Sequence, residues 1–373
     1  MNSVAIASKS RTSQRSAPVI VSGHRGSPEI LDKFTAEWNE LADEAVEDQP
    51  FFRPAWIRAY FRAFEPRAKV LLVTARVDGR LVMILPLVEE LSTFSKIPVR
   101  RLRVPVNYCC SRFDAVRRSG PEGNSAIDAS WEYLRSLRGW DLLLFRDALE
   151  GSTVSRIADC AEKQGLRTHS VADQPTPFIP VPSDPEKLAK MPPNPKLRSQ
   201  LKQVRLRIQQ LGELRFSRTT VADPSVLDRF YQLEASGWKG TSVDGLSVLK
   251  LGTQAFYNEV AWSAARDGNF SLYSLELNDV LIASHFSFAH RHRCYSPKVA
   301  YNEKYKQFAP GHLIIAEILK DCNRRGITGF DMTGQDQPWK MKWTAQTRAV
   351  SSHFIFKGPV GNLAFKVGRV LSG

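Results

Sequence analysis

A strand, a loop and a helix within residues 295–319 carry the groups best suited to bind an anion. Pro310 and Gly311 stand where the helix is expected to begin. Proline preorganises a first helical turn, and glycine lets a ligand approach the backbone. The free N–H groups of Gly311, His312 and Leu313, together with the helix dipole, predict a site for a phosphate-type group such as a pyrophosphate.

His285 is the best candidate for a general base. It lies on an expected strand, residues 281–289, on a face whose other members are Ala283, Ser287 and Ala289. A ring with small neighbours has room for a substrate beside it, and an unperturbed pKa of about 6.5 suits proton transfer near neutral pH. A histidine that is simply hydrogen-bonded in the core is the alternative interpretation.

Asp331 ends a further expected strand and is followed by a glycine-containing loop that leads to Lys340. The carboxylate could orient a base or an amine, and the ammonium could neutralise a phosphate. The neighbouring Trp339 and Trp343 are expected to lie in the core.

Glu234 and Trp238 lie four residues apart on one face near the end of an expected helix. A glutamate beside a large ring at the start of a loop can bind a substrate amine, although a glutamate at a helix end is usually solvated. With Tyr301, these two residues form the predicted substrate-binding set.

No metal site is predicted. His290, His292 and Cys294 are ligand types at alternate positions, but they fall at an expected hairpin turn, where an exposed basic turn is the simpler interpretation.

The elements that must position these residues alternate between strands and helices, which predicts an α/β (α+β) fold with a helix-covered sheet. Asp78-Gly79 and Asn278-Asp279 each separate two strand-like runs and predict two hairpins. Both halves repeat the order helix, helix, hairpin, helix, strand, which indicates a duplicated unit.

The 373 residues are long enough for two domains. Eight prolines within residues 175–195 predict irregular structure and the domain boundary. We therefore expect a disordered basic tail over 1–26, a first unit over 27–180, a Pro-rich linker over 181–195, a second unit over 196–360 and a C-terminal helix or tail over 361–373.

The chain is basic, with 52 Lys and Arg against 38 Asp and Glu and a net charge of +14. Most of the excess lies in residues 1–25 and 187–215, so general nucleic-acid binding is not indicated. The second stretch predicts an amphipathic basic helix that could contact an acidic cofactor, membrane surface or partner. Its apolar seam is expected to be Leu197, Leu201, Val204, Ile208 and Leu211.

Five cysteines without regular spacing indicate a reducing environment, and we predict a cytoplasmic protein. Neither a signal-peptide core nor a membrane-spanning run is predicted from the apolar residues.

Four passages together resemble the CelD/BcsL-type acetyltransferases of the GNAT superfamily, which are related to the FemAB-type aminoacyltransferases. They are LEASGWKG from residue 233, VLIASHFSF from residue 280, the passage ending in APGHLIIAEILKDCNRRGITGFD, and QPWKMKWT from residue 337. The resemblance is specific over residues 197–356 and implies tandem GNAT-like units, each with a mixed, mostly antiparallel sheet flanked by helices.

The resemblance also implies an acyl-CoA-dependent N-acyltransferase without a metal, acting on an amine of a small molecule or of an envelope or polysaccharide-related acceptor. His285 and Asp331 would be catalytic in the second unit. Alternatives are FemAB-like transfer from aminoacyl-tRNA and a degenerate, non-catalytic fold in exopolysaccharide or cellulose production. The residues expected to bind acyl-CoA are Phe308, Gly311, His312, Leu313 and Lys340.

Overall fold

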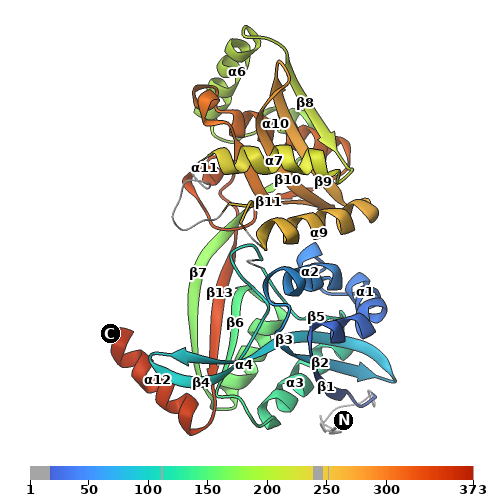
Figure 1. Cartoon of the computed structure of the whole chain (residues 1–373), viewed down its shortest axis with the longest axis vertical. Helices are drawn as coiled ribbons and strands as arrows, with labels where there is room; N and C mark the ends of the chain where they lie inside the picture. Colours follow the sequence, from blue (N-terminus) through green and yellow to red (C-terminus); the bar gives the residue numbers. More distant parts are fainter. Residues whose placement is uncertain (1–16, 111, 238–246, 251, 373) are drawn as a thin grey trace. The chain divides into compact units, whose positions relative to one another are not determined.

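The computed structural model describes residues 17–110, 112–237, 247–250 and 252–372, with the side chains of 370–372 excepted. The chain forms two compact units, one of Met1–Asp173 with Ala349–Gly373 and one of Gln174–Arg348. The division therefore falls before the predicted linker, and the C-terminal segment returns to the first unit (Figure 1).

The first unit is a mixed, mostly antiparallel sheet with helices packed on it. Its strands follow the order β1-β2-β3-β4-β6-β13, with β5 paired to β3, and only β4 and β6 run parallel among these described pairs. The strands are β1 (Ile20–Gly26), β2 (Lys69–Val77), β3 (Arg80–Phe94), β4 (Ile97–Arg103), β5 (Val116–Arg117), β6 (Leu142–Leu149) and β13 (Thr347–Phe356).

The helices of this unit begin repeatedly at a proline in the first turn, where a missing N–H costs no hydrogen bond. They are η1 (Pro28–Phe34), α1 (Thr35–Asp43), η2 (Pro50–Phe52), α2 (Pro54–Phe64), α3 (Pro121–Ser136), α4 (Thr153–Lys163) and α12 (Gly358–Ser372).

The second unit repeats this plan with the strand order β7-β12-β11-β10-β9-β8. Its single described parallel pair is β11 with β12, which corresponds to β4 with β6. The strands are β7 (Arg167–Pro180, shared with the first unit), β8 (Leu214–Thr219), β9 (Phe270–Leu277), β10 (Val280–His290), β11 (Arg293–Tyr301) and β12 (Gly329–Asp331).

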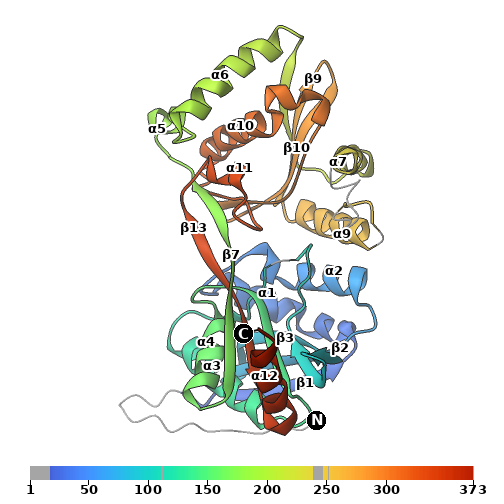
Figure 2. The same ribbon diagram turned by 90° about the vertical axis from the view of Figure 1, so that its left-hand side faces the viewer.

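Within this unit α7 and α9 pack on one face of the sheet, and α10 packs on the other with α6 behind it (Figure 2). The duplication and the mixed, mostly antiparallel architecture predicted from the sequence are confirmed. The helices are α5 (Pro185–Ala189), α6 (Pro195–Gln209), α7 (Pro224–Ser236), α9 (Thr253–Arg266), η3 (Glu303–Phe308), α10 (Pro310–Arg324) and α11 (Pro338–Met341).

Both predicted hairpins are confirmed, because their turn residues adopt positive φ angles. Asp78 and Gly79 have φ values of 49° and 79°, and Asn278 and Asp279 have 48° and 64°. These angles match the twist of two-residue hairpin turns.

Three local predictions are wrong. The expected tail contains β1, whose backbone pairs with the edge of β2. The proline-rich stretch contains the end of β7 and the helix α5, because a proline can begin a helix and its carbonyl still accepts, as Pro177 does from the N–H of Met332. The seam of α6 is buried at four positions, but Leu211 lies beyond the helix and is 52% exposed.

Candidate functional site

His285 lies on β10 with 2% of its surface exposed. Its Nδ1 lies 2.9 Å from Oγ of Ser296 on β11, and Oγ of Ser287 donates to the same Ser296 oxygen at 3.3 Å. The two hydroxyls and the ring therefore form a buried hydrogen-bonded chain, in which the donor order Ser287 to Ser296 to His285 satisfies each polar atom named.

Asp331 and Lys340 both form hydrogen bonds with the loop that follows β12. The N–H of Thr333 donates to Oδ1 of Asp331 at 2.8 Å, and Nζ of Lys340 donates to the carbonyls of Thr333 at 2.6 Å and Gln335 at 2.9 Å. Thr333 and Gly334 have φ values of 47° and 55°, so two successive left-handed residues fold the loop back over its own strand end.

Thr333 also connects this loop to the histidine. Its Oγ1 donates to the backbone carbonyl of Ser296 at 3.1 Å. The structure thus brings His285, Asp331 and Lys340 together through two residues, Ser296 and Thr333, that the sequence analysis did not single out. The available signal was the Thr333-Gly334 pair, a common turn composition, separated by one residue from the end of β12.

The start of α10 differs from the predicted anion cradle. Ala309 caps the helix with φ of 43°, and its carbonyl accepts from the N–H groups of both His312 and Leu313, at 2.9 and 3.1 Å. Two of the three N–H groups expected to be free are therefore already bonded. Among the described residues, only the Gly311 N–H of this set lacks an acceptor, and the role of the turn in ligand binding stays a prediction.

His312 contacts the indole of Trp343. The indole N–H donates to Nδ1 of His312 at 2.9 Å, with the rings stacked at 30°. Burial, with a smaller contribution from the charge of Lys342, lowers the pKa of His312 to about 4. The ring is therefore neutral near pH 7, and its proton lies on Nε2 because Nδ1 is the acceptor.

Tyr301 and Phe308 flank this turn. Tyr301 is 39% exposed, and its Cδ1 lies 3.8 Å from the place that a β-carbon on Gly311 would take. Phe308 is 8% exposed, with the guanidinium of Arg207 5.6 Å above its ring. An accessible aromatic ring therefore lies beside Gly311, and Lys304 and Lys306 of the preceding helix η3 are exposed.

Glu234 lies in a separate buried cluster. Its Oε2 accepts from the N–H of Val248 at 2.9 Å, and its Oε1 lies 3.5 Å from Nζ of Lys298 on β11. The Glu234 side chain is fully buried, and Lys298 lies over the Tyr257 ring at 5.5 Å. The amine that the sequence predicted to come from a substrate is thus supplied by the chain itself. A lysine in the interior of a mostly buried strand was the signal that could have pointed to this pair.

Three further sequence predictions concern Trp238, metal binding and membrane-spanning helices. Trp238 lies outside the described residues. Over the described ranges, no cluster of three or more His, Cys, Asp or Glu side chains could hold a metal ion. In the same ranges, none of the helices has both the length and the hydropathy needed to cross a bilayer.

Comparison with known proteins places this site in a recognised fold. Residues 195–341 match the model of the acetyltransferase (GNAT) domain family. No curated protein sequence matches the chain.

Several solved structures are similar over most of their length. FemX is 12% identical, with 89% of this chain and 98% of FemX covered at a TM-score of 0.59. The C-terminal domain of a putative lysylphosphatidylglycerol synthetase from Agrobacterium fabrum is 10% identical, with 91% and 97% covered and a TM-score of 0.53. L-PGS from Bacillus licheniformis is 11% identical, with 91% and 97% covered and a TM-score of 0.51.

At such identities these likenesses show the fold alone. The family match is therefore the finding that bears on function: residues 195–341, within the second unit, match a GNAT-type acetyltransferase domain, and this match indicates an acyltransferase.

Proposed function

We propose that the protein is an acyl-CoA-dependent N-acyltransferase whose chemistry takes place in the second unit. The observation that carries the proposal is the link through Thr333, which joins the loop of Asp331 and Lys340 to the Ser296–His285 chain. A GNAT-type domain with a base candidate, a fixed carboxylate and a fixed ammonium in one hydrogen-bonded network has the groups that acyl transfer to an amine requires.

The residues near the start of α10 fit a phosphate-bearing thioester in part. Gly311 offers one free N–H and no side chain, Tyr301 offers an exposed ring, and Lys304 and Lys306 offer positive charge. When bound, acyl-CoA supplies the activated acyl group. In the proposal, Gly311 and the cations hold its phosphates, and Lys340 keeps the loop after β12 closed by binding two of its carbonyls.

His285 accepts the proton of the acceptor amine in this proposal. In this proposal the Ser296 hydroxyl relays the proton: it donates its own proton to Nδ1 of His285, 2.9 Å away, and takes up the proton that the amine loses. Asp331 fixes the Thr333 backbone and, through it, the position of Ser296.

Isothermal titration calorimetry with acetyl-CoA and longer acyl thioesters tests the cofactor. The matched variants are Gly311→Asp and Gly311→Asn, which are isosteric and differ by one negative charge. Both side chains are tolerated in the first turn of a helix. We expect Gly311→Asp to bind thioesters at least about tenfold more weakly than Gly311→Asn, since the carboxylate repels the phosphates of the thioester and the neutral amide does not. Absence of binding of every thioester by the unmodified protein would overturn the proposal.

Transfer from aminoacyl-tRNA, as in FemAB-type enzymes, is the second candidate. The face of α6 away from its buried seam presents Lys196, Lys202 and Arg207 to solvent. An RNA donor predicts affinity that falls steeply with salt, whereas thioester binding should change little over the same range. The CelD/BcsL assignment, an envelope or polysaccharide-related acceptor, a non-catalytic role and a cytoplasmic location all remain predictions.

A further inference from the structure

Two arginines of the first unit converge on one neutral oxygen. Arg117 ends β5 and Arg156 lies in the first turns of α4, and NH1 of each donates to Oδ1 of Asn124, at 3.2 and 2.8 Å respectively. Asn124 is exposed at the start of α3. Two positive charges therefore share an acceptor that carries no charge.

Arg117 is 8% exposed, and its Nε is buried without a hydrogen-bond partner. Over the part of the chain that the structure describes, no carboxylate forms an ion pair with Arg117 or Arg156. Burial and the nearby charge of Arg156 lower the pKa of Arg117, partly offset by Asp114. A buried arginine beside a like charge is costly unless an anion compensates it.

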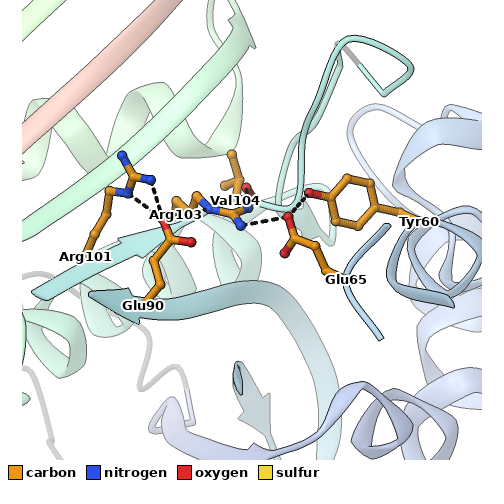
Figure 3. Close-up of polar contacts among 6 residues, drawn as sticks. All are labelled: Tyr60, Glu65, Glu90, Arg101, Arg103 and Val104. Atoms are coloured by element: carbon orange, nitrogen blue, oxygen red, sulfur yellow. Dashed lines mark hydrogen bonds and ion pairs between the residues drawn. The ribbon is translucent and has the colours of Figure 1, made fainter. Parts of the chain in front are cut away.

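Other arginines in this unit are compensated in that way. Arg103 donates to Glu65 at 2.7 Å and lies 3.1 Å from Glu90, which also accepts from Arg101 at 2.7 Å, and Glu65 accepts from Tyr60 (Figure 3). The same sheet therefore neutralises its partly buried guanidiniums with glutamates. The pair at Asn124 lacks such a partner among the described residues.

Asp114 and Glu122, the acids closest in the sequence to Arg117 and Asn124, are engaged elsewhere. The Asp114 carboxylate accepts from the N–H groups of Thr153 and Val154 at 2.9 and 3.0 Å, so it binds the first turn of α4. Glu122 pairs with Arg118 at 2.9 Å. Neither carboxylate is free to turn toward the two arginines without losing those bonds.

The backbone around the pair adds to the positive potential. The 16-residue helix α3 begins beside it, and its N-cap Gly120 provides no side-chain hydrogen bond. A β-carbon on Gly123 would lie 1.9 Å from the carbonyl oxygen of Arg118, so only glycine allows this turn to approach β5 so closely. That approach places Asn124 within reach of Arg117.

We propose that Arg117, Asn124 and Arg156 form a binding site for a phosphate group. Two guanidiniums balance a doubly charged phosphate, whereas a single carboxylate would leave one positive charge uncompensated. Arginine suits this ligand because its planar donors bind phosphate oxygens in pairs. The phosphate belongs either to free inorganic phosphate or to an ester within a larger ligand. The site is independent of the chemistry proposed for the second unit.

Calorimetric titration of the full chain with inorganic phosphate is the first test. We expect Arg156→Gln to weaken binding at least about tenfold. Arg138→Gln is the matched control, because Arg138 is an exposed arginine of the same unit and its loss changes the net charge equally. Equal binding by Arg156→Gln and the unmodified protein, or an equal loss in Arg138→Gln, would overturn the site.

Asn124→Asp is the second test, since it places a carboxylate of the same shape between the two arginines. We expect a higher Tm without phosphate and the loss of the Tm increase that phosphate gives the unmodified protein. A lower Tm, or an unchanged response to phosphate, would contradict the proposal. A parallel titration with AMP identifies the source: tighter binding than inorganic phosphate supports an ester, and equal or weaker binding supports the free ion.

Discussion

The indole N–H of Trp343 donates to Nδ1 of His312, with 2.9 Å between the two nitrogens. This bond fixes the tautomer of the imidazole, because an Nδ1 that accepts cannot carry a proton. His312 therefore presents a neutral ring with a proton on Nε2 at the start of α10. With its pKa lowered to about 4, His312 is a donor near neutral pH and a poor candidate for the general base.

Protonation of His312 should destabilise the fold. Its pKa is about 4 in the folded state and about 6.5 in an unfolded chain, so the stabilisation is complete above pH 6.5 and is lost as pH falls from there toward 4. We expect a loss of about 1–2 kcal/mol from this group by pH 4.5, given partial exposure. His312→Gln keeps an acceptor for Trp343 and cannot titrate. Urea unfolding at pH 7, 5.5 and 4.5 should show a smaller decrease for the variant, and equal decreases would contradict the assignment.

Removal of the Lys340 ammonium should open the loop after β12. Lys340→Met leaves the carbonyls of Thr333 and Gln335 without their donor, and we expect a loss of about 1–3 kcal/mol in the free energy of unfolding. Lys342→Met is the matched control, because Lys342 is an exposed lysine of the same segment. Chemical denaturation measures both variants. A control that loses as much stability would show that the charge of the segment, and not the two hydrogen bonds, is responsible.

The Glu234–Lys298 pair should behave as one unit. Either single change, Glu234→Gln or Lys298→Met, removes one partner of a buried ion pair, and such changes typically cost about 3–5 kcal/mol. The double variant should lose clearly less than the sum of the two. A double-mutant cycle from urea unfolding gives the coupling energy, and strictly additive losses would mean that the pair is not coupled.

The architecture could be predicted from the sequence because its signals are local. The Asp78-Gly79 and Asn278-Asp279 turns specify their hairpins by positive φ, and the four buried residues of α6 follow a helical period. The prediction of irregular structure in the proline-rich stretch was wrong, because it relied on the number of prolines. A proline lacks only the backbone N–H, so it can lie in β7 or at the start of α5 wherever that N–H needs no acceptor.

The residues of the candidate site could be singled out by type from the sequence, but the contacts between them could not. His285, Asp331 and Lys340 stand out in sequence, but their connection runs through Thr333 and Ser296, whose roles depend on a left-handed turn and on strands far apart in the chain. At the start of α10 the prediction itself failed. It assumed an N-cap residue in the usual extended conformation, which would leave the first N–H groups of the helix free. Ala309 in a left-handed conformation let one carbonyl accept from two of them.

His285 should control the pH dependence of acyl transfer. We expect His285→Ala to lower kcat by about 10²–10⁴-fold, the usual contribution of a positioned general base, and to remove the acid limb of the pH–rate profile. Ser296→Ala leaves the imidazole in place but deletes the hydroxyl 2.9 Å from Nδ1, so it should lower kcat with a smaller change in KM and move the acid limb without removing it. Release of free thiol from acetyl-CoA, followed from pH 5.5 to 9 with an amine acceptor, measures both effects. An unchanged rate and profile in His285→Ala would remove this residue from the mechanism, and a normal profile in Ser296→Ala would exclude the hydroxyl as the proton route.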